Sequence, residues 1–135
     1  MYSLDELKKQ NLEISQLCDV LTVLMEKATL QDNPFVAELM ERFKEKVWMH
    51  LVFEDKTIYS ALLNSDDEKI RQVANTFHES AKAIKHRFSV FVRHWCATSM
   101  TAEEYSTLCK ESLEILGLIK DRIEYENTHM FPLVT

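Results

Sequence analysis

Four long segments of helical hydrophobic spacing alternate with three short polar interruptions along the chain. Within each segment, apolar residues recur three or four positions apart and so fall on one face of an α-helix. The expected helices span residues 4–29, 34–63, 66–98 and 102–130. Connections this short make consecutive helices antiparallel neighbours. The pattern therefore predicts an all-α fold, an up-down-up-down antiparallel four-helix bundle that residues 1–135 form as one domain.

Capping residues stand at the expected start of every helix. Asn33 precedes Pro34, which combines a capping side chain with proline at the first helical position. The other three starts carry a hydroxyl residue three positions before a glutamate, which is the pattern of a capping box: Ser3–Glu6, Ser65–Glu68 and Thr101–Glu104. At the other end of the chain, Pro132 is expected to end the last helix.

Composition supports a helical fold. The 135 residues contain one glycine and two prolines, too few for the many turns of a sandwich or barrel. Hydrophobic residues make up 46% of the chain, which excludes a disordered composition. The net charge of −6, without a basic cluster, argues against nucleic-acid binding.

Two further features favour a cytoplasmic protein. Its cysteines are odd in number and form no CxxC pair, so we expect reduced thiols and neither a disulfide framework nor a zinc knuckle: Cys18, Cys96 and Cys109. The acidic start lacks the apolar region of a signal peptide, and no apolar run is long enough to cross a membrane.

Six polar residues interrupt the apolar faces, where a core is expected: Asn11, His50, Glu54, His78, Arg122 and Glu126. At about 1.5 Å rise per residue, the four helices place Asn11, Glu54, His78 and Arg122 at one level, about 18 to 20 residues from one end of the bundle, with His50 and Glu126 one turn away. Metal and cofactor sites of helix bundles are built from such layers. A buried network, in which Arg122 neutralises Glu54 or Glu126, would use the same layer.

The second and fourth segments also repeat one order of residue types. The two copies read His50-x3-Glu54-Asp55-x2-Ile58-Tyr59 and Arg122-x3-Glu126-Asn127-x2-Met130-Phe131. The repeat indicates two helical hairpins related by a pseudo-twofold axis. Glu54 and Glu126 would then lie on diagonal helices and point at the centre.

Over essentially its whole length, the chain resembles the hemerythrin-like, or HHE cation-binding, family. That family places a histidine on the first helix, His-x3-Glu on the second, a histidine on the third and His-x3-Glu or an acidic variant on the fourth. The matching elements here are His50-x3-Glu54, His78 and Glu126-Asn127-x2-Met130-Phe131-Pro132. The resemblance implies a non-haem di-iron centre bridged by two carboxylates, with His50, Glu54, His78 and Glu126 as metal ligands.

Two positions depart from the family pattern, one in each half of the chain. Asn11 replaces the histidine of the first helix, and Arg122 replaces that of the fourth. An amide oxygen is a weak ligand, and a guanidinium cannot ligate because it stays protonated. Arg122 would instead compensate the central carboxylates without metal. We therefore expect either no metal or one weakly bound non-haem iron or other divalent cation, with Asn11 as a weak ligand.

The remaining histidines, His86, His94 and His129, are expected to have structural or surface roles. No nucleophile–base spacing or phosphate-binding glycine loop suggests an enzyme. The favoured interpretation is a regulatory or binding module with a degraded di-iron site and a regulatory protein partner. The alternative is a non-haem iron protein that binds or senses dioxygen, nitric oxide or iron. Neither interpretation involves nucleic acid or a membrane, and the sequence gives no signal for an oligomeric state.

Overall fold

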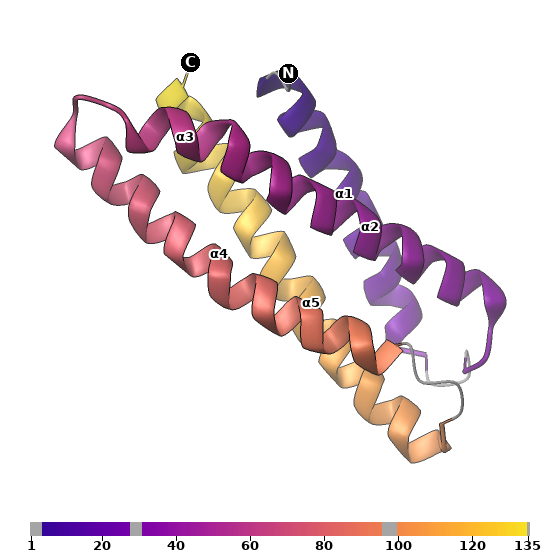
Figure 1. Cartoon of the computed structure of the whole chain (residues 1–135). Helices are drawn as coiled ribbons and strands as arrows, with labels where there is room; N and C mark the ends of the chain where they lie inside the picture. The colour runs from indigo at the N-terminus through magenta and orange to yellow at the C-terminus, as the bar shows by residue number, and fades with distance from the viewer. Residues whose placement is uncertain (1–3, 28–30, 96–99, 135) are drawn as a thin grey trace.

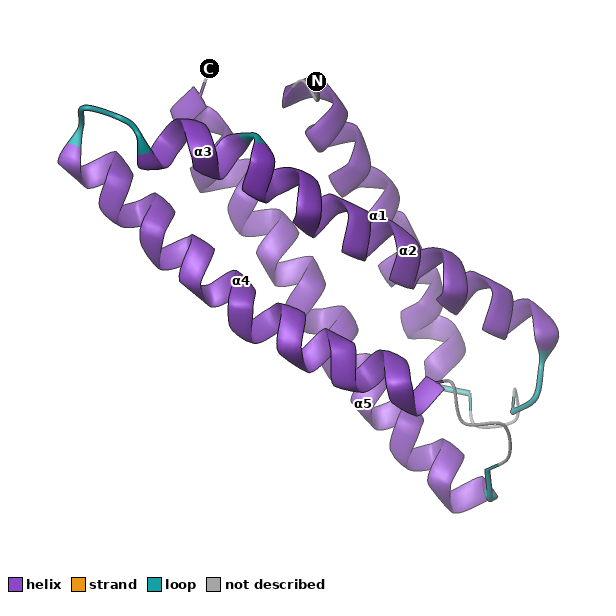
Figure 2. Ribbon diagram, viewed as in Figure 1, coloured by secondary structure: helices purple, strands orange, loops and turns teal. Residues whose placement is uncertain are grey.

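The computed structural model describes residues 4–27, 31–95 and 100–134, and its regular elements within these ranges are all helical (Figures 1 and 2). The elements are α1 (Leu4–Met25), α2 (Pro34–Lys56), α3 (Ile58–Leu63), α4 (Glu68–Trp95), α5 (Ala102–Tyr125), the π-helical turn η2 (Glu126–Met130) and the 3-10 turn η3 (Phe131–Val134). The expected all-α class is confirmed. Within the described ranges, no helix is long and apolar enough to cross a membrane.

Packing places α1 between α2 and α5, while α4 packs against α3 and α5. Figure 1 shows both chain termini at the same end of the bundle. The buried apolar side chains form two clusters, a large one in the body of the bundle and a smaller one towards the termini. On α1, the large cluster begins at Ile14 and the small one contains Leu7. Asn11 lies between them, so the expected polar layer separates the two apolar clusters.

Two of the expected helix starts are confirmed. The Asn33 side chain accepts a hydrogen bond from the Phe35 N–H at 2.9 Å, and Pro34 occupies the first helical position. Thr101 and Glu104 form the reciprocal bonds of a capping box. Ser3, of the expected Ser3–Glu6 box, lies outside the described residues.

The expected Ser65–Glu68 capping box is wrong. Helix α4 begins at Glu68, and the Asp67 carboxylate accepts the hydrogen bond from the Lys69 N–H at 2.9 Å. Ser65 lies too early and accepts from the Asp67 N–H instead. Asp67 is the better-placed cap because it directly precedes the first helical residue.

The predicted helix over 34–63 is interrupted at Thr57. This residue has φ −118° and ψ −78°, outside the helical range, and separates α2 from α3. Its hydroxyl donates to the Phe53 carbonyl at 2.7 Å, a contact that bends helices. After the interruption, the Tyr59 hydroxyl reaches back to the Glu54 carboxylate at 3.2 Å.

The ends of the other predicted helices also shift. The last α-helix ends at Tyr125 and continues as the π-helical turn η2, in which the Phe131 N–H bonds to the Glu126 carbonyl. Pro132 does not end the helical structure, because η3 runs through it. Helix α1 ends at Met25, before the predicted position 29, whereas α4 is described up to Trp95. The predicted ends of the first and third helices, positions 29 and 98, lie outside the described residues.

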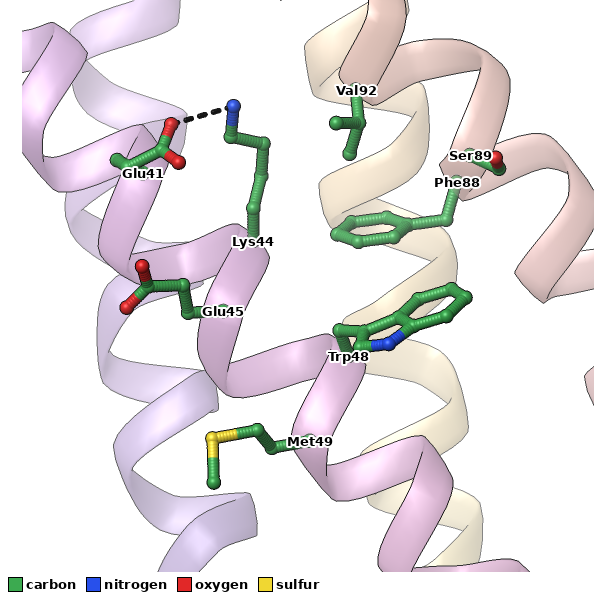
Figure 3. Close-up of a pocket in the computed structure, with 8 residues that line it drawn as sticks. All are labelled: Glu41, Lys44, Glu45, Trp48, Met49, Phe88, Ser89 and Val92. Carbon is green, nitrogen blue, oxygen red and sulfur yellow. Dashed lines mark ion pairs between the residues drawn. The ribbon is translucent and has the colours of Figure 1, made fainter.

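Two large apolar side chains on α2 are half exposed, Trp48 at 50% and Met49 at 53%. They border a groove of about 410 Å³ between α2 and α4, where Figure 3 shows the Trp48 indole beside the Phe88 ring. None of the six polar-layer residues lines this groove. It is therefore a surface feature separate from the buried layer.

Candidate metal centre

The structure buries five of the six residues of the polar layer: Asn11, His50, Glu54, Arg122 and Glu126. The sixth, His78 on α4, is half-buried. Glu54 comes from the end of α2, just before the Thr57 interruption, and Glu126 begins the π-helical turn. Both carboxylates of the internal repeat thus lie where the helix departs from regular α geometry.

Three of these side chains converge on one point. His50, Glu54 and Glu126 each offer a ligand atom, and these atoms all lie within 4.8 Å of one another. His50 Nε2 is 2.5 Å from Glu54 Oε1 and 3.6 Å from Glu126 Oε1. The expected meeting of two central carboxylates beside a histidine is therefore present in the structure.

The facing atoms of this group make no well-directed hydrogen bonds. Among the described residues, the buried atoms of the layer without a well-directed hydrogen bond include Asn11 Oδ1, His50 Nε2, Glu54 Oε1 and Glu126 Oε1, although His50 Nε2 and Glu54 Oε1 are in close contact. Buried polar atoms are normally paired, so the converging atoms of His50, Glu54 and Glu126 call for a common partner. One imidazole nitrogen with two carboxylate oxygens is a donor set for a divalent cation such as Fe²⁺, Mn²⁺ or Zn²⁺. The residues present fit one cation.

His50 and Asn11 each make a hydrogen bond through their N–H group, on the side of the residue away from its acceptor atom. The Nδ1–H of His50 donates to Gln10 Oε1 at 2.7 Å, and the Asn11 side-chain amide donates to Asn127 Oδ1 at 3.3 Å. Each contact uses the N–H of the ligand residue and leaves its acceptor atom free. Second-shell contacts of this kind orient metal ligands in known sites.

Arg122 occupies the other side of Glu54. Its Nη2 donates to Glu54 Oε2 at 3.2 Å and to the Tyr59 hydroxyl at 2.5 Å. The guanidinium carbon also lies 3.9 Å from the centre of the Phe77 ring, within range of a cation–π contact. Glu54 therefore has one oxygen bound to a fixed protein cation and the other facing His50. The expected compensation of the carboxylate by Arg122 is present as an ion pair.

The carboxylates and the imidazole perturb one another's ionisation. Burial and the nearby Glu54 charge raise the pKa of Glu126 to about 8. Burial opposes ionisation of Glu54, but contacts with His50 and Glu126 and the charge of Arg122 outweigh it and lower its pKa to about 2. Burial likewise disfavours the charged imidazole, yet contacts with Glu126 and Glu54 raise the pKa of His50 to about 9. The group thus favours bound positive charge, whether protons or a cation.

His78 is not part of the converging group. Its ring lies 5.0 Å from the ring of Tyr59, which contacts Arg122 and Glu54 Oε2. His78 therefore lies towards the Arg122 side of Glu54. The other three histidines, His86, His94 and His129, are exposed.

Sequence reasoning missed the structural roles of Gln10 and Tyr59. Gln10 lies one turn before Ile14, at the edge of the apolar face of α1, and this position was its only signal. Tyr59 follows the predicted ligand Glu54 by five positions, a spacing that faces away in a regular helix. The Thr57 interruption brings it back to the site.

Comparison with known proteins agrees with this geometry. A family model for the hemerythrin HHE cation binding domain matches residues 3–134. No curated protein and no solved structure matches the chain. The family match covers nearly all of the chain, including every residue of the buried polar layer. The chain belongs to the hemerythrin HHE cation-binding domain family.

Proposed function

We propose that this hemerythrin-like domain binds one divalent cation, held by His50, Glu54 and Glu126 with the Asn11 oxygen as a weak fourth ligand. In this proposal the protein is a regulatory or binding module with a degraded di-iron site, and not an enzyme. The supporting observation is that the two carboxylate oxygens of Glu54 face different partners. Oε2 is bound to Arg122, whereas Oε1 faces His50 without a well-directed hydrogen bond.

Charge balance supports one cation rather than two. When His50 is neutral, as a metal ligand must be, two ionised carboxylates and Arg122 leave the buried layer with one uncompensated negative charge. One divalent cation turns this into a single positive charge, whereas two would leave three positive charges in a site of low dielectric. Because uncompensated buried charge is costly, the second cation is disfavoured.

A bound cation would affect the end of the bundle where both chain termini lie. The proposed ligands come from α1, α2 and η2, and η2 leads directly into the last described turn. When bound, the cation supplies the positive charge that the carboxylates lack and, if it is iron, a redox-active centre. A ligand held only by the folded state stabilises that state by mass action. This supports a module whose folding stability depends on whether the cation is bound. A regulatory protein partner and a cytoplasmic location remain predictions.

A non-haem iron protein that binds or senses dioxygen, nitric oxide or iron is the second candidate function. It is favoured by the donor set, because imidazole and carboxylate together suit Fe²⁺. The candidates differ in the number of irons and in the spectrum, since an oxo-bridged pair of ferric ions absorbs in the near-ultraviolet and visible range.

The test is metal content after anaerobic loading of chelator-treated protein with Fe²⁺, Zn²⁺ or Co²⁺. We expect about one tightly held ion per chain, no oxo-bridged absorption after exposure to air, and loss of binding in Glu126→Gln. Glu114→Gln, which changes an exposed acid paired with Arg87, is the matched control and should bind normally. Two tightly held irons with oxo-bridged absorption would overturn the proposal. So would the absence of any bound ion, or uptake that Glu126→Gln leaves unchanged.

A further inference from the structure

Both ring nitrogens of His50 have close polar contacts. Nε2 faces the Glu54 and Glu126 carboxylates, and Nδ1 lies 2.7 Å from Gln10 Oε1 on the neighbouring helix α1. The ring is nearly fully buried. Gln10 itself is half-buried and belongs to no part of the family pattern described above. Its contact with His50 therefore calls for its own explanation.

The chemistry of the two nitrogens shows what this contact does. A side-chain amide oxygen only accepts hydrogen bonds, so Nδ1 must carry the hydrogen. A neutral imidazole then has its lone pair on Nε2, where a cation can bind it. Without an acceptor at Nδ1, the two carboxylates would draw the hydrogen to Nε2, because each offers a strong acceptor there. The ring would then present an N–H to the site in place of a lone pair.

We propose that Gln10 is a positioning residue of the cation site, holding the Nδ1–H of His50 so that Nε2 stays available and directed at Glu54 and Glu126. This inference rests on the proposed function. Gln10 would not touch the cation, and its effect would pass through the orientation and tautomer of His50. Second-shell partners of metal-binding histidines act in this way in other sites.

The surroundings of Gln10 make the proposal testable. Its side chain borders a surface hollow of about 170 Å³ between α1 and α2, which the exposed ion pair of Glu13 and Lys46 also lines. A substitution at Gln10 therefore changes the wall of a hollow rather than the packed core. The ion pair supplies control variants in the same hollow that leave the Gln10–His50 bond intact.

The experiment compares Gln10→Met, which keeps the length but removes the oxygen, with Gln10→Glu, which keeps an acceptor. Zn²⁺ affinity is measured by competition with a chelating dye. We expect Gln10→Met to weaken Zn²⁺ binding about 10- to 100-fold. Gln10→Glu should bind at least as tightly as the parent. Lys46→Met changes the local charge by the same one unit as Gln10→Glu, so it measures the purely electrostatic effect. Glu13→Gln should leave affinity within a few-fold of the parent.

The second readout does not need metal. In nitrogen-15 NMR of the metal-free protein at about pH 10, above the raised pKa of His50 of about 9 so that the imidazole is neutral, His50 should show a slowly exchanging Nδ1–H signal, assigned with His50→Gln. Gln10→Met should lose this signal and Gln10→Glu should keep it. A Gln10→Met protein with parental Zn²⁺ affinity and an intact Nδ1–H signal would overturn the inference. If the parent binds no cation, the proposed function fails, and the NMR signal still decides whether Gln10 positions His50.

Discussion

Arg122 and Glu54 form a buried ion pair across the bundle, with Nη2 3.2 Å from Oε2 and side chains only 4% and 1% exposed. The pair joins α5 to α2, the two helices that carry the internal repeat. Phe77 covers the guanidinium on one face, and Tyr59 shares its Nη2. Arg122 is thus a fixed cation at one of the two positions where the family pattern has a histidine.

Removal of this fixed cation should be costly. Arg122→Ala leaves the Glu54 carboxylate buried beside Glu126 with no permanent positive charge. We expect the free energy of unfolding of the metal-free protein to fall by about 3–5 kcal/mol, as when one member of a buried pair is deleted. Urea unfolding followed by circular dichroism in the presence of a chelator measures this loss.

Arg42→Ala is the matched control. Arg42 pairs with Glu38 at 3.1 Å on the surface of α2, and both side chains are more than 60% exposed. Exposed pairs contribute little, so this change should cost less than about 1 kcal/mol. Equal losses for the two variants would show that the Arg122 pair does not compensate a buried charge.

The buried thiols should be unreactive in the folded protein. Cys18 is fully buried, and burial raises its pKa to about 12. Burial also raises the pKa of Cys109. Because alkylation requires the thiolate, iodoacetamide at about pH 8 should modify both residues slowly until the chain is unfolded. Peptide mass mapping before and after guanidinium treatment checks this. Rapid native modification of Cys18 would contradict its burial. Cys96 lies outside the described residues.

The stability of the metal-free protein should fall as the pH rises from about 6 to about 9.5. The pKa of His50 is raised to about 9 in the folded state, so its stabilising contribution is complete below its unfolded value of 6.5 and is lost as the pH passes 9. Glu126, raised to about 8 from 4.5, acts with the same sign because the folded state retains its proton longer. We expect a decrease on the order of 2 kcal/mol, measured by urea unfolding in chelator.

A cation should remove this pH dependence. A bound ion takes the place of the protons in the group, so saturating Zn²⁺ should flatten or reverse the decrease. In the metal-free protein, Glu126→Gln should remove the part that arises from Glu126, while Glu114→Gln should leave the dependence unchanged. Stability that rises between about pH 6 and about pH 9.5 in chelator would have the wrong sign for this site.

The sequence predicted the height of each site residue along its helix better than the direction of its side chain around the helix axis. Counting residues along each helix placed Asn11, Glu54, His78 and Arg122 at one height, and the structure buries all of them except His78, which is half-buried. Height follows from the constant rise of a helix, which small irregularities hardly change. Direction around the axis is less robust, because one extra residue turns every later side chain by about 100°. His78 shows this limit, since its height was predicted but its contact with Tyr59 was not.

The two helix irregularities could not be read from periodicity. At Thr57 a single hydroxyl-to-carbonyl bond competes with the helix, a local effect that hydrophobic spacing does not register. At Glu126 the wider π-helical turn has one trace in the sequence, the two adjacent large apolar residues Met130 and Phe131. The structure buries both of them. Neighbouring positions of a regular helix point about 100° apart, so two buried neighbours are compatible with a helix end as well as with a π-helical turn.

The last prediction tests whether the layer is the remnant of a two-metal site. Asn11 and Arg122 stand where the family pattern has histidines, one in each half of the repeat. The double change Asn11→His with Arg122→His adds a nitrogen donor to each half and removes the internal cation. It also frees Glu54 Oε2 and the Tyr59 hydroxyl from their contacts with the guanidinium. Because the carboxylates would then need external charge, we expect about two Fe²⁺ or Co²⁺ per chain and a higher melting temperature on binding.

Single variants separate the two contributions. Asn11→His alone should strengthen the existing site beside His50 without raising the stoichiometry, because Arg122 still holds Glu54 Oε2. Arg122→His alone should mainly destabilise the metal-free protein. Arg87→His, on the exposed surface of α4, adds a histidine outside the layer and should change neither metal content nor melting temperature on loading. If the double variant folds yet takes up no more metal than the parent, the polar layer is an ordinary buried network. Its six residues would then be explained by hydrogen bonds and charge pairing alone, and the proposal of a degraded two-metal site would fail.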